Sequence, residues 1–153
     1  SLTHRHTRKS QLIPLVLIHK TGGTYWNTWD RQVRDHLLRN ALISQDDLHL
    51  YRITDSPEQA VKWITRFYRN FCSSRFVKDL LVIRLRRAPT PSALDALNED
   101  FTDIITGRKI HLTKPLPEER DDPDFTDLPR IAFGFNRRDY GRLRLMIDRL
   151  NSL

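Results

Sequence analysis

Residues 12–29 read LIPLVLIHKTGGTYWNTW, an apolar run that passes through a glycine pair into an aromatic-rich segment. The run from Ile13 to Ile18 shows no polar alternation, which is typical of a strand covered on both faces in a parallel sheet. Gly22 and Gly23 allow a tight turn, and Thr24 is placed to cap a helix through its side-chain oxygen. The stretch therefore predicts a strand, a turn and a helix, which together form half of a βαβ unit.

The loop between this strand and helix, His19 to Thr24, is the first candidate for ligand binding. In open α/β sheets such loops lie at the carboxyl edge, where ligands bind, and free N–H groups at a helix start favour an anion. We predict a substrate-binding role for His19, Thr21, Gly22, Gly23 and Thr24. The alternative is a plain turn, because loop glycines are first of all turn formers and this pair matches neither GxGxxG nor GxxxxGK[ST].

The rest of the first half continues with a helix over 24–40, a strand over 48–53 and a helix from Pro57 to about Asn70. Ser56 and Gln59 resemble a capping box at the start of the last helix. Two parallel strands with two helices make too small a sheet to be stable alone. We expect the missing strands to come from a larger doubly wound domain of which this chain is a fragment, or from an identical chain.

The second half predicts a strand over 78–85, a helix from Pro91 that ends before Gly107, and a short strand over 109–112. An acidic, proline-punctuated surface loop follows at 116–127. A strand over 131–135 then leads to a final helix that Asn136 caps. The predicted fold class is α/β: two parallel βα units, then a small mixed β-α-β-β-α appendage.

The net charge of the chain indicates which kinds of partner it could bind. It carries 26 Lys and Arg against 19 Asp and Glu, a net charge of +7, which permits binding to phosphates or nucleic acid. The arginines are spread along the chain and are not interleaved with aromatics, so we interpret most of them as solvated surface and do not expect a nucleic-acid partner. No apolar stretch approaches the roughly 18–20 residues of a membrane span, so we expect no membrane partner. The single cysteine, Cys72, fits a reducing compartment, and we expect a cytoplasmic protein.

The titratable residues do not form a recognisable active centre. None of the six histidines has a second ligand three or four residues away on a predicted helix face, and His4 and His6 form only an HxH pair in a polar segment. We predict no metal site and no cofactor. The carboxylates of Asp46, Asp47, the helix around Glu99 and the loop 116–127 are interpreted as surface groups, so no catalytic residue is assigned.

The first half is similar to the C-terminal part of the LOG (LONELY GUY) family, formerly described as possible lysine decarboxylases. In many bacterial members P-x-V-L-x-G-x-x-Y-W leads to D-x-L-x-x-x-L-x-x-x-G-x-I-S-x-x-D-L and D-x-P-x-E-A-V-x-x-I. The positions of this chain that match are Pro14, Val16, Leu17, Tyr25, Trp26, Leu37, Ile43, Ser44, Asp47, Leu48, Asp55, Pro57, Ala60, Val61 and Ile64. The resemblance covers roughly residues 7–70 and rests on structural positions.

The resemblance implies a Rossmann-like fold and hydrolysis of the N-glycosidic bond of nucleoside 5′-monophosphates, which releases free base and ribose 5-phosphate. The family signature PGGxGTxxE supplies the phosphate-binding glycines and a catalytic glutamate, and it precedes the matched segment. Gly22-Gly23-Thr24 is not that motif.

On this resemblance, residues 1–72 would be the C-terminal part of a LOG-like Rossmann domain, and residues 73–153 an α/β extension. The nucleoside monophosphate would be bound through the missing N-terminal part. We expect a homo-oligomer and an inactive isolated chain. The alternative is a non-enzymatic nucleotide-binding or oligomerisation module.

Overall fold

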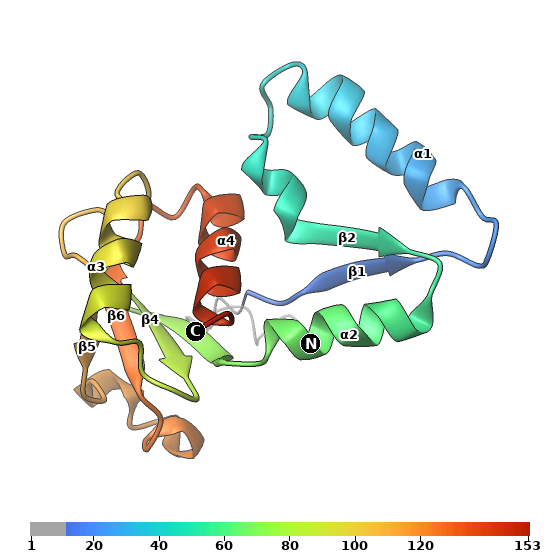
Figure 1. Cartoon of the computed structure of the whole chain (residues 1–153). Helices are drawn as coiled ribbons and strands as arrows, with labels where there is room; N and C mark the ends of the chain where they lie inside the picture. Colours follow the sequence, from blue (N-terminus) through green and yellow to red (C-terminus); the bar gives the residue numbers. More distant parts are fainter. Residues whose placement is uncertain (1–11) are drawn as a thin grey trace.

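The computed structural model describes residues 12–153, and it is a mixed α/β fold with two separate sheets (Figure 1). The elements in chain order are β1 (Leu15–Ile18), α1 (Tyr25–Gln32), the π-helical η2 (Val33–Leu38), the 3₁₀ helix η3 (Asp46–Leu50), β2 (Tyr51–Thr54), α2 (Pro57–Phe67), β3 (Phe71–Val77), β4 (Leu80–Leu85), α3 (Pro91–Asp100), β5 (His111–Thr113), the 3₁₀ helices η4 (Pro117–Glu119) and η5 (Pro123–Phe125), β6 (Arg130–Gly134) and α4 (Tyr140–Leu150).

The first sheet consists of β1 and β2, which pair in parallel from Leu15 opposite Tyr51 to Ile18 opposite Thr54. The predicted parallel pairing is therefore confirmed. Helices α1 and α2 lie on opposite sides of this two-stranded sheet (Figure 1). The predicted strand over 48–53 begins later than expected, because residues 48–50 belong to η3.

The second sheet is antiparallel, with four strands in the order β3-β4-β6-β5. Its first strand corrects the predicted order. The second half is β-β-α-β-β-α, because Phe71, directly after the predicted end of the preceding helix, opens the unpredicted strand β3. The strand expected over 78–85 starts at Leu80, because Lys78, with a φ of 54°, forms the tight turn between β3 and β4. The boundary predicted between residues 72 and 73 falls inside β3.

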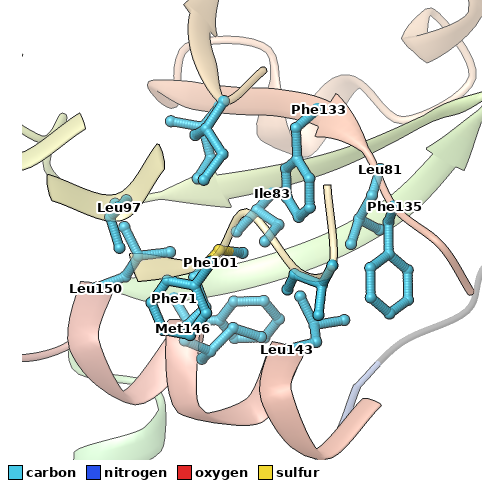
Figure 2. Close-up of a cluster of buried hydrophobic side chains, with 14 of the residues drawn as sticks. Phe71, Leu81, Ile83, Leu97, Phe101, Phe133, Phe135, Leu143, Met146 and Leu150 are labelled. Atoms are coloured by element: carbon cyan, nitrogen blue, oxygen red, sulfur yellow. The ribbon is translucent and has the colours of Figure 1, made fainter. Parts of the chain in front are cut away.

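The main core lies between one face of this sheet and helices α3 and α4. Figure 2 shows side chains from β4 and β6, such as Ile83 and Phe133, meeting Leu97 of α3 and Met146 of α4. All four are at most 2% exposed.

The final helix begins later than expected, at Tyr140. Asn136, which was predicted to cap this helix, instead accepts hydrogen bonds from the backbone N–H groups of residues 138 and 139 in the turn before it.

The opposite face of the same sheet is charged. Arg84 of β4 and Arg130 of β6 are each 1% exposed, and both donate to Oε1 of Glu119, at 2.8 and 2.6 Å. Arg84 also donates to Asp122 at 2.7 Å. A buried charge is tolerated when it is paired and hydrogen-bonded. The predicted surface loop 116–127 thus covers this face of the sheet, and the surface interpretation is wrong for Glu119, which is 4% exposed.

Two asparagines join the end of α2 to the end of α4. The side-chain oxygen of Asn151 accepts from the backbone N–H groups of Asn70 and Phe71, each at 2.8 Å, and its amide nitrogen donates to the carbonyl of Phe67. Asn70 in turn donates to the carbonyl of Leu150 at 3.0 Å. Both asparagines are buried. This pair satisfies backbone groups at the point where the chain passes from the first sheet to the second, and we call Asn70 and Asn151 the asparagine clasp.

A second contact between the two halves places η3 against the start of α4. A Cβ atom at Gly141 would lie 2.3 Å from the carbonyl carbon of Asp46, so only glycine fits at this approach. Arg142, the next residue, lies 3.9 Å from the Asp46 carboxylate and donates to Asp103 at 2.8 Å. The parallel unit is therefore packed against the second sheet and its helices.

No helix within residues 12–153 has the length and apolarity that crossing a membrane requires. The polar segment that holds the His4 and His6 pair lies outside the described residues.

We expect Glu119→Gln to destabilise the protein, because it leaves two buried guanidinium groups without their shared carboxylate. Removing one partner of a buried ion pair costs about 3–5 kcal/mol, so the free energy of unfolding should fall by several kcal/mol in urea titrations followed by circular dichroism. The matched control is Glu118→Gln, which removes the exposed pair with Lys78 and should leave the urea midpoint nearly unchanged. Equal midpoints for Glu119→Gln and the unaltered protein would contradict this account of the loop.

Candidate functional site

The candidate site is the carboxyl edge of the β1–β2 sheet. Because the strands are parallel, both end at the same edge, and α1 and α2 both begin there (Figure 1). The backbone N–H of His19 donates to the carbonyl of Thr54 at 3.2 Å, which joins the two loops directly. The structure thus places the predicted loop His19 to Thr24 beside a second loop, Thr54 to Ser56, which the sequence analysis did not assign to the site.

The glycine pair builds a compact turn. Gly22 has a φ of 76°, in the left-handed region that favours glycine, and the N–H of Gly23 donates to the carbonyl of Lys20 at 2.8 Å. A Cβ atom at Gly23 would lie 2.9 Å from that carbonyl oxygen and 3.1 Å from Nδ1 of His19. Both glycines are therefore needed for the turn itself, and substituting either one tests the turn as much as any ligand contact.

The start of α1 is open. The predicted side-chain cap by Thr24 is wrong: Thr24 makes no side-chain cap hydrogen bond, and the first turn of α1 holds no acidic residue. Thr21 and Thr24 are exposed. The indole of Trp26 donates to the carbonyl of Ile18 at 3.1 Å and ties the helix back to the strand. An uncapped helix start with free N–H groups suits an anion.

His19 is half-buried under the turn. Its Nδ1 atom is shielded from solvent and has no hydrogen-bond partner within residues 12–153. Most buried polar atoms in proteins are paired, so this nitrogen is an exception, and because it is shielded a ligand would reach it only if the turn moved.

Helix α2, which follows the second loop, has a side-chain cap, whereas α1 has none. The hydroxyl of Ser56 accepts from the N–H of Gln59 at 3.2 Å, which confirms Ser56 as a helix cap, and it donates to Glu58 at 3.0 Å. The backbone and Ser56 hydrogen bonds lower the pKa of Glu58. Asp55 is exposed at the tip of this loop. Its place could have been found from the sequence, because it follows the second parallel strand as His19 follows the first.

Behind this edge, Asp30 of α1 forms a polar cluster with Arg34 and Tyr51. Arg34 Nε donates to Asp30 at 2.8 Å, and the Tyr51 hydroxyl donates to the other carboxylate oxygen at 2.5 Å. Burial raises the pKa of Asp30, but the hydrogen bonds from Arg34 and Tyr51 outweigh it, so the net pKa is lowered. Burial, followed by the hydrogen bond to Asp30, raises the pKa of Tyr51 to about 12. The cluster fixes α1 on β2 and holds the tyrosine neutral.

The other carboxylates considered as candidates do not gather at this edge. Asp103 pairs with Arg142 at 2.8 Å, and Asp100 pairs with Arg149 at 3.2 Å. Asp121 and Asp122 pair with arginines of the second sheet. Within residues 12–153 no group of three or more His, Cys, Asp and Glu side chains could hold a metal ion. The edge therefore offers backbone donors that suit an anionic ligand, one histidine beneath the turn, and one exposed carboxylate, Asp55, which would repel an anion placed next to it.

Comparison of the chain with family models, curated proteins and solved structures gives no match.

We expect Tyr51 to ionise at about pH 12. Because the fold favours the neutral phenol, the contribution of Tyr51 to stability is present below its ordinary pKa of 10.0 and is lost as the pH rises towards about 12. The measurement is the phenolate absorbance of the protein minus that of Tyr51→Phe, which isolates this tyrosine. A difference titration centred near pH 10 would show that the bond to Asp30 does not hold in solution.

Proposed function

We propose that this chain is the C-terminal part of a Rossmann-like, LOG-like domain that hydrolyses the N-glycosidic bond of nucleoside 5′-monophosphates. The observation that carries the proposal is the β1–α1–β2–α2 unit, with parallel strands and one helix on each side (Figure 1). This is the repeating unit of a doubly wound sheet. The match of residues 13–64 to the LOG pattern supports the family and the substrate class.

The apolar surface of β1 supports completion of this sheet by further strands. Leu15 and Ile18 of β1 are 48% and 47% exposed, Ile13 just before the strand is 61% exposed, and within the described residues β1 pairs with β2 alone. An apolar edge strand with free ladder groups favours pairing with another strand. Added strands would bury β1 and bring the loop His19 to Thr24 towards the middle of the carboxyl edge, where doubly wound sheets bind nucleotides.

In the proposed reaction, this chain would form the rim of the nucleotide-binding pocket. The open start of α1 would face the anionic ligand, Thr21 and Thr24 are exposed beside it, and His19 lies beneath the turn that carries them. Cleavage of an N-glycosidic bond through an oxocarbenium-like transition state needs a carboxylate held against the ribose. Asp55 is exposed and not enclosed, so the catalytic acid would come from a PGGxGTxxE-like segment outside these 153 residues.

We therefore expect the isolated chain to release no free base from AMP, measured by chromatography, whereas a longer product of the same reading frame that carries the PGGxGTxxE-like segment should release it.

In that longer protein Thr24→Val removes a rim hydroxyl without touching a cap bond and should raise KM. Thr102→Val, at an exposed position beyond α3, is the matched control. Release of base by the isolated chain, abolished by Asp55→Asn, would show that the active centre lies within these residues.

The second candidate is an oligomerisation module, and the exposed apolar surface of β1 favours it. If two copies associate through this edge, Leu15→Lys should shift the chain towards monomer in sedimentation equilibrium, because a charge on an edge strand opposes pairing. Leu112→Lys on β5, the outer strand of the other sheet, is the control, since Leu112 is 43% exposed and Leu15 is 48% exposed. A monomeric unaltered chain, or equal shifts for both variants, would rule out association through β1.

A further inference from the structure

A small cavity of about 130 Å³ lies where β2, α2 and α4 meet. Its lining combines three arginines, two aromatic rings and one carboxylate: Arg52, Trp63, Arg66, Phe67, Arg144 and Asp148. These residues come from three elements, far apart in the sequence, that the junction between the two halves brings together. Arg52 lies near the middle of β2, away from the loops at its carboxyl end, so the cavity is distinct from the candidate site above.

Arg144 is the buried member of the cavity. It is 4% exposed, its Nε donates to Asp148 at 3.2 Å, and its guanidinium carbon lies 4.6 Å from the ring centre of Phe67. Its two terminal nitrogens make no hydrogen bond to any residue in the described part of the chain. They are not sealed from solvent, because only His19 Nδ1 and Arg75 Nε are shielded and unpaired there. The terminal N–H groups of Arg144 are therefore available to a ligand in the cavity, although the rest of the side chain is buried.

The charge of the lining is unbalanced. Asp148 is the one carboxylate, and it is already engaged by Arg144. Arg52 stacks over Trp63 at 5.4 Å from the ring centre and, like Arg66, forms no ion pair within residues 12–153. Three guanidinium groups against one carboxylate leave an excess of two positive charges around one small, partly open cavity. Like charges that line one cavity repel each other, and a bound anion relieves that repulsion.

We propose that this cavity binds a phosphoryl group, either as inorganic phosphate or as the phosphate end of an organic phosphate. The planar guanidinium fork matches the oxygens of phosphate, and a dianion would neutralise the excess charge. The volume is several times the roughly 30 Å³ that a water molecule occupies in the liquid. It therefore suits one phosphoryl group, while the rest of an organic phosphate would extend into the open hollow beside Arg66 and Arg69.

The proposal is tested by calorimetric titration of the chain with inorganic phosphate at about 0.15 M salt, where surface charges are screened. We expect saturable binding that Arg52→Gln and Arg66→Gln each weaken about tenfold, since each removes one charge-assisted contact. Both side chains are exposed and lie outside the hydrophobic core, so both variants should fold. The matched control is Arg120→Gln, an exposed arginine of the loop 116–127 that lines neither hollow, which should keep the affinity within about twofold.

A second titration with AMP separates the two sources of the phosphoryl group. Competition between AMP and inorganic phosphate, lost in Arg66→Gln, would assign the cavity to an organic phosphate, and binding of inorganic phosphate alone would assign it to the free ion. No saturable phosphate binding, or an equal loss of affinity in Arg120→Gln, would overturn the proposal. Neither result depends on the glycosidase activity, because no residue of the candidate site at the carboxyl edge is altered.

Discussion

The asparagine clasp is the constraint on which the arrangement of the two halves depends. At the end of α2 the chain turns directly into β3, and this change leaves backbone groups that neither a helix nor a sheet can satisfy. Asn151, at the far end of the sequence, supplies an acceptor for two of the N–H groups and a donor for the carbonyl of Phe67. A buried polar group without a partner costs about 1–3 kcal/mol. The parallel unit can therefore hold its place only when α4 is docked, which links the first half of the fold to the last helix.

The second sheet shows why the charge of this chain is distributed as it is. Three strands each place an arginine on the face opposite the main core, and the loop 116–127 covers that face with Glu119, Asp121 and Asp122. The loop carries no periodic apolar pattern because its contact with the sheet is made by ion pairs, with only a small apolar cluster around Val82. In sequence the paired acids and arginines are 11 to 46 residues apart, so each one taken alone resembles a solvated group.

The elements that could be predicted from the sequence are those with local signals. The glycine pair located the first turn, Ser56 located the start of α2, and the unbroken apolar run identified β1 as a strand in a parallel sheet. Strand β3 was missed because Phe67 and Phe71 continue the helical spacing, and because the pairing of Arg75 with Asp121 cannot be seen locally. At the candidate site, the loop after β1 was found from its glycines, but Asp55 needed the rule that parallel strands end together. The phosphoryl cavity had no signal at all, since its three arginines come from β2, α2 and α4.

These features together place two candidate anion sites at opposite ends of one small unit. The carboxyl edge offers an uncapped helix start, and the junction with α4 offers a buried arginine with unpaired donors. A ligand that binds only the folded state stabilises it by mass action, by about 2.7 kcal/mol at a hundredfold excess over its Kd. Because Arg144 belongs to α4 and Arg52 to β2, a phosphoryl group between them would strengthen the same junction that the asparagine clasp holds. Occupancy of the cavity would then hold the parallel unit, and the exposed edge of β1 with it, in a fixed orientation for any strand that completes the sheet.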